Sequence, residues 1–237
     1  MNVWRRHVWL GSAAVLLFAF LAPVSLADLY DYGWENGGTL LGFYGNVGDY
    51  ENVSTGTDPE GPFTVSPHGG SSMLRLNESP HSGTPQGWVA FVEHLNEGEE
   101  VTASFWGWDS TPGASPSMRL WGHYALSGDI NSYEGSAGGS VTYTTGDPAW
   151  DQVSWTWTFD SNSGTRDALV IEVRLYSTPS TDPEGSTDFW VDDLQVDAPG
   201  TATVSFAVPE PSGLCFAGLA ALVAFRRLSR RRKEKQA

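Results

Sequence analysis

Residues 101–108 read VTASFWGW, and their side chains alternate between two kinds along the run. Small or apolar side chains take one side of an extended chain, and polar or aromatic ones take the other. A period of two residues is typical of a β-strand that buries one of its faces. The pattern recurs in residues 118–124, 153–159 and 169–176, so it extends over the middle of the chain.

Shorter runs of the same kind lie between clusters of Gly, Pro, Asn and Asp, which favour turns. No stretch between them shows a sustained 3.6-residue apolar period, the mark of an amphipathic helix. Strands at this spacing without intervening helices predict an all-β fold, an antiparallel β-sandwich of two sheets. The shorter strand candidates are residues 72–77, 86–95, 140–145 and 188–197.

The apolar side chains of these runs are the candidate core, because a sandwich buries one face of each sheet. Its expected members include Val101, Phe105, Leu120, Ile171 and Val173 and, in the second half, Trp150, Trp155 and Trp157. Residues 28–208 contain no cysteine, so no disulfide reinforces this core. A domain of roughly 180 residues is long enough to be held together by packing alone.

The same region is strongly acidic. Residues 28–208 contain 26 acidic side chains and four basic ones, all arginine, which gives a net formal charge of −22. This charge argues against nucleic acid as a partner, because phosphate binding requires clustered cations. Acidity of this size favours solubility or cation binding.

Three short segments occur in a characteristic order. They are WENG at 34–37, AWDQVSWT at 149–156 and FWVDDLQV at 189–196. In order and spacing they resemble the jelly-roll carbohydrate-binding modules attached to many xylanases and glucanases, whose closing strand reads aromatic, aliphatic, Asp, Asp, aliphatic. The resemblance spans residues 30–197 and implies a jelly-roll sandwich that binds a glycan without catalysis.

The resemblance also implies a structural Ca²⁺ site. In those modules an acidic residue of the first strand and an aspartate of the last strand hold the ion together. The corresponding candidates are Glu35, Asp192 and Asp193, whose carboxylate oxygens are the hard ligands that calcium prefers. The alternative is that both aspartates lie at a strand end, where water or a loop satisfies them.

A candidate sugar-binding face lies on the side of the strands that faces away from the core. Aromatic rings stack on the apolar faces of pyranose rings, while charged and hydroxylated side chains bond the hydroxyls. Exposed tryptophans are otherwise costly, because each leaves a large apolar area in water. The alternative is that a loop at 128–139 covers Trp106 and Trp108. The candidate ligand-binding residues are Trp106, Trp108, Arg119, Trp121, His123, Glu172, Arg174 and Tyr176.

Residues 28–208 lack the motifs of common catalytic sites. Their four histidines do not have a metal-ligand spacing such as HExxH, and GxSxG, P-loop and GxGxxG motifs are missing. Carboxylate pairs arise by chance among 26 acids, so they do not indicate a glycosidase. The sequence therefore predicts a protein that is not an enzyme, with a polysaccharide hydrolase as the remote alternative.

The first 27 residues have the parts of a secretory signal peptide. Two arginines precede an apolar run over residues 8–21, and SLA at 25–27 places small residues at positions −3 and −1 of a cleavage site. Cleavage would leave a chain that begins at Asp28, outside the inner membrane. An uncleaved membrane anchor is the alternative.

The C-terminal segment, residues 208–233, also has three parts. VPEP at 208–211 interrupts regular structure, because proline fixes φ and lacks a backbone donor. An apolar run at 213–225 and a basic cluster follow. In this order the parts resemble the PEP-CTERM sorting signal of Gram-negative bacteria. The resemblance implies a short transmembrane helix before processing, and recognition by an exosortase of Val208, Pro209, Glu210 and Pro211.

One exported domain with a delivery signal at each end is therefore expected. The predicted order is a signal peptide at 1–27, a jelly-roll domain at 28–197, a linker at 198–207 and a sorting signal at 208–233. The predicted role is non-catalytic binding of extracellular polysaccharide at the cell surface, in the extracellular matrix or in a biofilm. The main alternative is a purely structural surface protein whose tryptophans all belong to the core.

Overall fold

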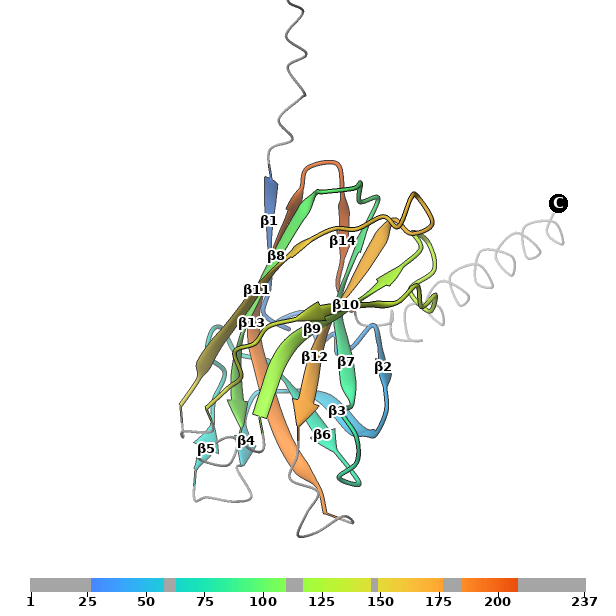
Figure 1. The fold of residues 1–237 in the computed structure, drawn as a ribbon. Coiled ribbons are helices and arrows are strands. Elements are labelled where there is room, and N and C mark those ends of the chain that lie inside the picture. Colours follow the sequence, from blue (N-terminus) through green and yellow to red (C-terminus); the bar gives the residue numbers. More distant parts are fainter. Residues whose placement is uncertain (1–26, 58–62, 110–116, 146–148, 177–184, 209–237) are drawn as a thin grey trace, which may run out of the picture.

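A computed structural model describes residues 27–57, 63–109, 117–145, 149–176 and 185–208 of the 237. All regular secondary structure in these ranges is β-strand, and the strands form two antiparallel six-stranded sheets and one small hairpin. The prediction of an all-β protein with two antiparallel sheets is confirmed, and the arrangement is consistent with a β-sandwich (Figure 1).

Both predicted delivery signals fall almost entirely outside the described residues. Of the predicted signal peptide only Ala27 is described, and of the VPEP motif only Val208, which is exposed. Pro209, Glu210, Pro211 and the predicted transmembrane helix are not among the described residues. Within the described ranges, no helix has the length and apolar character needed to cross a bilayer.

The first sheet, sheet A, is organised around its long strand β13. Along one edge β13 pairs with β8, and along the other it pairs first with β6 and then with β1. The full order is β11-β8-β13-β6-β3, with β1 beside β13. The strands of sheet A are β1 (Ala27–Tyr32), β3 (Val47–Val53), β6 (Met73–Glu78), β8 (Glu100–Asp109), β11 (Asp151–Thr158) and β13 (Thr187–Pro199).

The second sheet, sheet B, has the order β10-β9-β12-β7-β14, and β2 pairs with the first half of β7. Its central strands β9, β12 and β7 supply the surface that is described below. The strands of sheet B are β2 (Gly42–Tyr44), β7 (Gln86–Glu93), β9 (Ser117–Ala125), β10 (Ser136–Gly139), β12 (Ala168–Tyr176) and β14 (Thr203–Ser205). A separate hairpin joins β4 (Gly56–Thr57) and β5 (Thr64–Val65).

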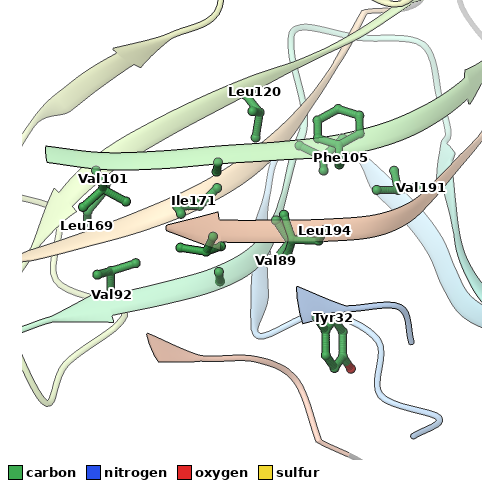
Figure 2. Close-up of a cluster of buried hydrophobic side chains, with 14 of the residues drawn as sticks. Tyr32, Val89, Val92, Val101, Phe105, Leu120, Leu169, Ile171, Val191 and Leu194 are labelled. Atoms are coloured by element: carbon green, nitrogen blue, oxygen red, sulfur yellow. The ribbon is translucent and has the colours of Figure 1, made fainter. Parts of the chain in front are cut away.

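The core fills the space between the two sheets, as Figure 2 shows for its central part. Its side chains come from the inward positions of strands in both sheets. Because only every second residue of a strand points inward, burial explains the period of two in the sequence. Complete burial of an aliphatic side chain contributes about 1.5–3 kcal/mol to folding. Fully buried members include the five that the sequence predicts: Val101, Phe105, Leu120, Ile171 and Val173.

Two stretches differ from their predicted structure. Residues 140–145 do not form a strand, although Ser140 and Thr144 still donate backbone hydrogen bonds to β9. The Ser140 hydroxyl bonds to both the carbonyl and the amide of Thr142, and such local side-chain bonds compete with a ladder. Residues 198–207, the predicted linker, hold the end of β13 and all of β14.

The segment 198–207 therefore belongs to the sandwich. β14 pairs with β7 in sheet B, and Ala198 is fully buried in the core. The ring of Phe206 stacks on that of Tyr32 with centroids 4.9 Å apart and planes at 2°. The Tyr32 hydroxyl donates a hydrogen bond to the carbonyl of Ala207, so the last described residues are fastened to β1.

A candidate polysaccharide groove on sheet B

A groove with a volume of about 680 Å³ crosses the outer face of sheet B. Strands β2, β7, β12 and β9 contribute to it, and so does the segment between β9 and β10. Its volume lies within the range of ligand-binding clefts. The groove is lined by Phe43, Tyr44, Gln86, Trp88, Trp121, His123, Asn131, Tyr133, Ser136, Glu172 and Arg174.

Strand register brings the outward positions of three strands into rows across the sheet. Along β12, Leu169, Ile171 and Val173 belong to the core between the sheets, so the residues that alternate with them lie on the face away from that core. Neighbours within a row are close enough to interact, since directly opposite residues have Cβ atoms about 5 Å apart. The two rows in β7–β12–β9 order are Trp88–Glu172–Trp121 and Gln86–Arg174–Arg119.

A buried acid and a histidine lie side by side in the groove. Oε1 of Glu172 and Nδ1 of His123 are 2.5 Å apart, and the two side chains are almost fully buried. With its amide oriented to donate, Gln86 lies 2.9 Å from Oε2 of Glu172. These bonds hold the carboxylate in one position, because a buried charge must be paired and hydrogen-bonded.

Trp88 lies across the neighbouring strand β2. A Cβ atom at Gly42 would come within 2.4 Å of Cε3 of Trp88, so only glycine leaves room for the indole there. The indole also meets the ring of His123 edge-on, with centroids 5.3 Å apart. Its Nε1 is buried without a hydrogen-bond acceptor among the described residues, so this donor stays unpaired.

Two arginines contact Trp121. The guanidinium carbons of Arg119 and Arg174 each lie 4.4 Å from the centre of its ring. Arg119 also lies within 5.0 Å of the ring centres of Tyr143 and Tyr176. Cation–π contacts of this kind hold a guanidinium in place while part of it stays in water.

Exposed aromatic rings border the groove. Tyr44 is 66% exposed and Tyr133 is 68% exposed, and both line the groove together with the buried polar pair. Tyr133 comes within 5.6 Å of the His123 ring, measured between centroids. Exposed aromatic rings beside buried polar groups give the groove both apolar faces and hydrogen-bonding groups.

The predicted ligand-binding residues divide between two sheets. Trp121, His123, Glu172 and Arg174 line the groove, and Arg119 and Tyr176 lie beside it on the same face of sheet B. Trp106 and Trp108 lie on β8, in sheet A. The eight residues therefore do not share one face, because β8 and β9 are consecutive in the chain but belong to opposite sheets.

Trp106 and Trp108 belong to an aromatic cluster on the outer face of sheet A. The ring of Trp106 stacks on His68 with centroids 4.0 Å apart and planes at 13°. Trp108 meets Trp150 edge-on at 6.0 Å, and Trp190 is fully buried in the same cluster. Trp106 and Trp108 are half-buried in consequence.

A loop does cover these tryptophans, but it is not the predicted one at 128–139. His68 comes from the connection between β5 and β6, and the indole of Trp150 donates to the carbonyl of Ser66 in that connection. Trp150 therefore lies outside the sheet–sheet core, whereas Trp157 is buried in it as predicted. Trp106 also borders a hollow of about 420 Å³ beside β1 and β13.

The three predicted calcium ligands surround the loop at 68–72. The carboxylate of Glu35 accepts hydrogen bonds from the amides of Ser71 and Ser72 and from the Ser71 hydroxyl, which lower its pKa. Asp192 accepts from the amide of Gly69, and Asp193 lies 2.7 Å from His68. The carboxylates thus fasten the loop that covers the aromatic cluster.

Asp192 is a fully buried carboxyl. Burial raises its pKa to about 6, although backbone hydrogen bonds oppose this shift. A Cβ atom at Gly33 would lie within 4.0 Å of the side chains of Glu35, Asp192 and Asp193, so one small space adjoins all three. Among the described residues, no three His, Cys, Asp or Glu side chains are already grouped to hold a metal.

Several groove residues escape prediction from the sequence. Trp88 and Gln86 share the period of two in residues 86–95, so that pattern could have identified them as outward positions. Phe43 and Tyr44 lie on a three-residue strand, and Tyr133 lies in a loop. Periodicity carries no information about such short or irregular segments.

Comparison with solved structures finds similar folds. No family model and no curated protein matches the chain. The CBM22-1 and CBM22-2 xylan-binding domains from Paenibacillus barcinonensis Xyn10C are 13% and 16% identical, with TM-scores of 0.46 and 0.47. They cover 74% and 71% of this chain and 97% and 98% of their own.

TmCBM61, solved in complex with β-1,4-galactotriose, is 16% identical with a TM-score of 0.41, and covers 69% of this chain and 92% of its own. These three structures are carbohydrate-binding modules. At these identities and TM-scores, the likeness carries no argument about a ligand of this chain.

Proposed function

We propose that the groove of sheet B binds a polysaccharide chain and that the protein is not an enzyme. The observation that carries the proposal is the composition of the groove. Exposed rings of Tyr44 and Tyr133 lie beside the buried pair of His123 and Glu172 in one open channel of about 680 Å³.

This combination suits the two chemical faces of a sugar. The axial C–H bonds of a pyranose form apolar patches that pack on aromatic rings, whereas its hydroxyls require donors and acceptors. Exposed aromatic side chains that bind nothing would leave apolar area in water without compensation. The sandwich is, in this proposal, a jelly-roll domain with its ligand on the outer face of one sheet.

Affinity electrophoresis of the full-length protein tests the proposal. Native gels that contain xylan, mixed-linkage glucan, galactan or mannan should retard the protein if one of them binds. Replacement of both rim tyrosines, Tyr44→Ala and Tyr133→Ala, should abolish the retardation, whereas Tyr30→Ala on β1 is the matched control. If neither these glycans nor an acidic polysaccharide such as polygalacturonate retards the wild-type protein, the purely structural alternative is favoured. Release of sugar from the gel would indicate a hydrolase.

Export and sorting form a second part of the proposal. The signal-peptide pattern at 1–27 and the VPEP motif at 208–211 support secretion, exosortase processing and delivery to a bacterial surface or extracellular matrix. Deletion of residues 209–211 should leave the protein in the inner-membrane fraction. Unchanged distribution after that deletion would contradict the sorting role.

A structural Ca²⁺ is the third part. The side chains of Asp192, Asp193 and Glu35 all adjoin Gly33, and a bound cation would offset the negative charge of their carboxylates. Glu35, Asp192 and Asp193 would hold the ion and thereby fix the loop at 68–72 against sheet A. Calcium and chelator titrations, described below, test this.

A further inference from the structure

The four arginines of residues 28–208 are of two kinds. Arg75 forms ion pairs with three carboxylates, and Arg166 forms one with Asp160. Arg119 and Arg174 have no carboxylate oxygen within 4.0 Å among the residues that the structure describes. In a region with 26 acidic side chains, this lack of acidic partners requires an explanation.

These two arginines lie directly opposite each other. Arg174 on β12 pairs in register with Arg119 on β9, on the outer face of sheet B. Like charges at directly opposite positions destabilise a sheet. An acidic side chain at either position would relieve the repulsion, and the chain instead has two cations there.

Only uncharged groups contact the two guanidinium groups within the described ranges. Arg119 donates to the carbonyl of Ser140 at 3.2 Å, and Arg174 donates to the hydroxyl of Thr84 at 2.7 Å. Nε of each arginine is buried without an acceptor in the same part of the chain. A guanidinium has five N–H donors, so both groups retain unused ones.

The aromatic rings keep both cations at the groove. Each guanidinium carbon lies 4.4 Å from the centre of the Trp121 ring, and both Trp121 and Arg174 line the groove. The positive charge is therefore concentrated at one end of a channel in a protein with a net charge of −22 over residues 28–208. Long-range attraction cannot explain binding of an anion here, so selectivity must come from contacts at the arginine pair.

We propose that the groove selects acidic polysaccharides, and that a carboxylate of a uronic acid residue binds between Arg119 and Arg174. Arginine forks match the two oxygens of a carboxylate, and one anion between the two groups would replace their repulsion with attraction. This inference rests on the proposed glycan-binding function and adds the chemical class of the ligand. The sugar ring that carries the carboxylate would lie beside Trp121.

Matched pairs of polymers provide the test. Polyglucuronate, polymannuronate and polygalacturonate are each compared with a carboxyl-reduced derivative of the same linkage, with the full-length protein in 0.15 M NaCl and EDTA. Charge-assisted hydrogen bonds are stronger than neutral ones, so we expect at least one acidic polymer to bind roughly tenfold or more tightly than its neutral derivative. In the double variant Arg119→Gln/Arg174→Gln this ratio should fall to about one.

Three further measurements make the result decisive. Arg166→Gln, which removes an arginine outside the groove, should leave the ratio unchanged, and melting curves verify that each variant is folded. Dextran sulfate tests whether the bound anion is a carboxylate or any anion. If the wild-type protein binds dextran sulfate as tightly as the best uronate polymer and the double variant does not, the assignment to a carboxylate is overturned.

The two proposals fail in different ways. Binding of neutral polymers with no preference for any acidic partner overturns the acidic-glycan inference and leaves the proposed function in place. A preference that persists in the double variant also overturns it. If neither the acidic polymers nor their neutral derivatives bind, both proposals fail.

Discussion

The two outer faces of the sandwich both carry tryptophans, but they differ in what covers them. On sheet A, His68 stacks on Trp106 and Trp150 packs against Trp108, with the fully buried Trp190 in the same cluster. On sheet B, the groove is open and its exposed rings, Tyr44 and Tyr133, face water.

The difference shows that an outward aromatic residue is not by itself a ligand site. A loop fastened by three carboxylates turns the aromatic surface of sheet A into a satellite core. Among the residues that the structure describes, no comparable loop closes the groove of sheet B, where polar side chains accompany the aromatic rings. We therefore assign stability to the cluster on sheet A and propose binding for the groove on sheet B.

The largest expected effect is on the sheet A cluster. Trp190→Ala should lower the free energy of unfolding by about 3–5 kcal/mol, because it leaves a large cavity among packed rings. Urea unfolding monitored by circular dichroism measures this change. The folded variant should still bind polysaccharide. A loss below about 1 kcal/mol would mean that the cluster is not a structural unit.

Calcium should act on the same side of the molecule. At pH 7.5, calcium at roughly 100 times its dissociation constant should stabilise the protein by about 2.7 kcal/mol relative to EDTA. Differential scanning calorimetry detects this as a rise in Tm. Asp192→Asn should remove the difference, whereas Asp197→Asn, at an exposed position of the same strand, should keep it. Identical melting in calcium and EDTA would refute the ion.

The groove should respond in affinity and not in stability. Tyr133→Ala should weaken polysaccharide binding about tenfold, equivalent to about 1.4 kcal/mol, because a stacking ring is lost. Tyr133→Phe keeps the ring and should bind nearly as well as the wild type. Isothermal titration calorimetry separates the two variants, and equal losses in both would show that the hydroxyl matters and the ring does not.

The smallest effect should come from the cover of the cluster. His68→Ala removes the ring that stacks on Trp106 and the partner of Asp193. Because these two contacts lie near the surface, we expect the free energy of unfolding to fall by about 1 kcal/mol. Iodide quenching of tryptophan fluorescence should increase as Trp106 becomes more exposed. Unchanged quenching would mean that the loop does not shield this tryptophan.

The sequence contains enough information for the strands and for much of the core. Val101, Phe105 and Ile171 recur with a period of two because each strand buries one face, and that period is visible without a structure. The same pattern identifies Glu172 and Arg174 as outward residues. In the structure Glu172 lies between Trp88 and Trp121 in one row, and Arg174 lies in the neighbouring row.

What the pattern cannot provide is the partner of each strand. Trp106 and Trp121 both occupy outward positions on consecutive strands. Because β8 and β9 lie in different sheets, the one sugar-binding face predicted from the sequence corresponds to two separate faces. Tyr44 and Tyr133 reach the groove from a short strand and a loop. The burial of Trp106 depends on His68, which lies far away in the sequence and is brought close by the loop at 68–72.

Hydroxyl-radical footprinting of the full-length protein, with and without a polysaccharide that retards it, tests the central claim most directly. Mass spectrometry then reports oxidation of individual aromatic side chains. We expect binding to protect Tyr44, Trp88 and Tyr133 severalfold and to leave Trp106 and Trp108 unchanged. Protection of Trp106 and Trp108, with Tyr44 and Tyr133 oxidised as in the free protein, would contradict the account.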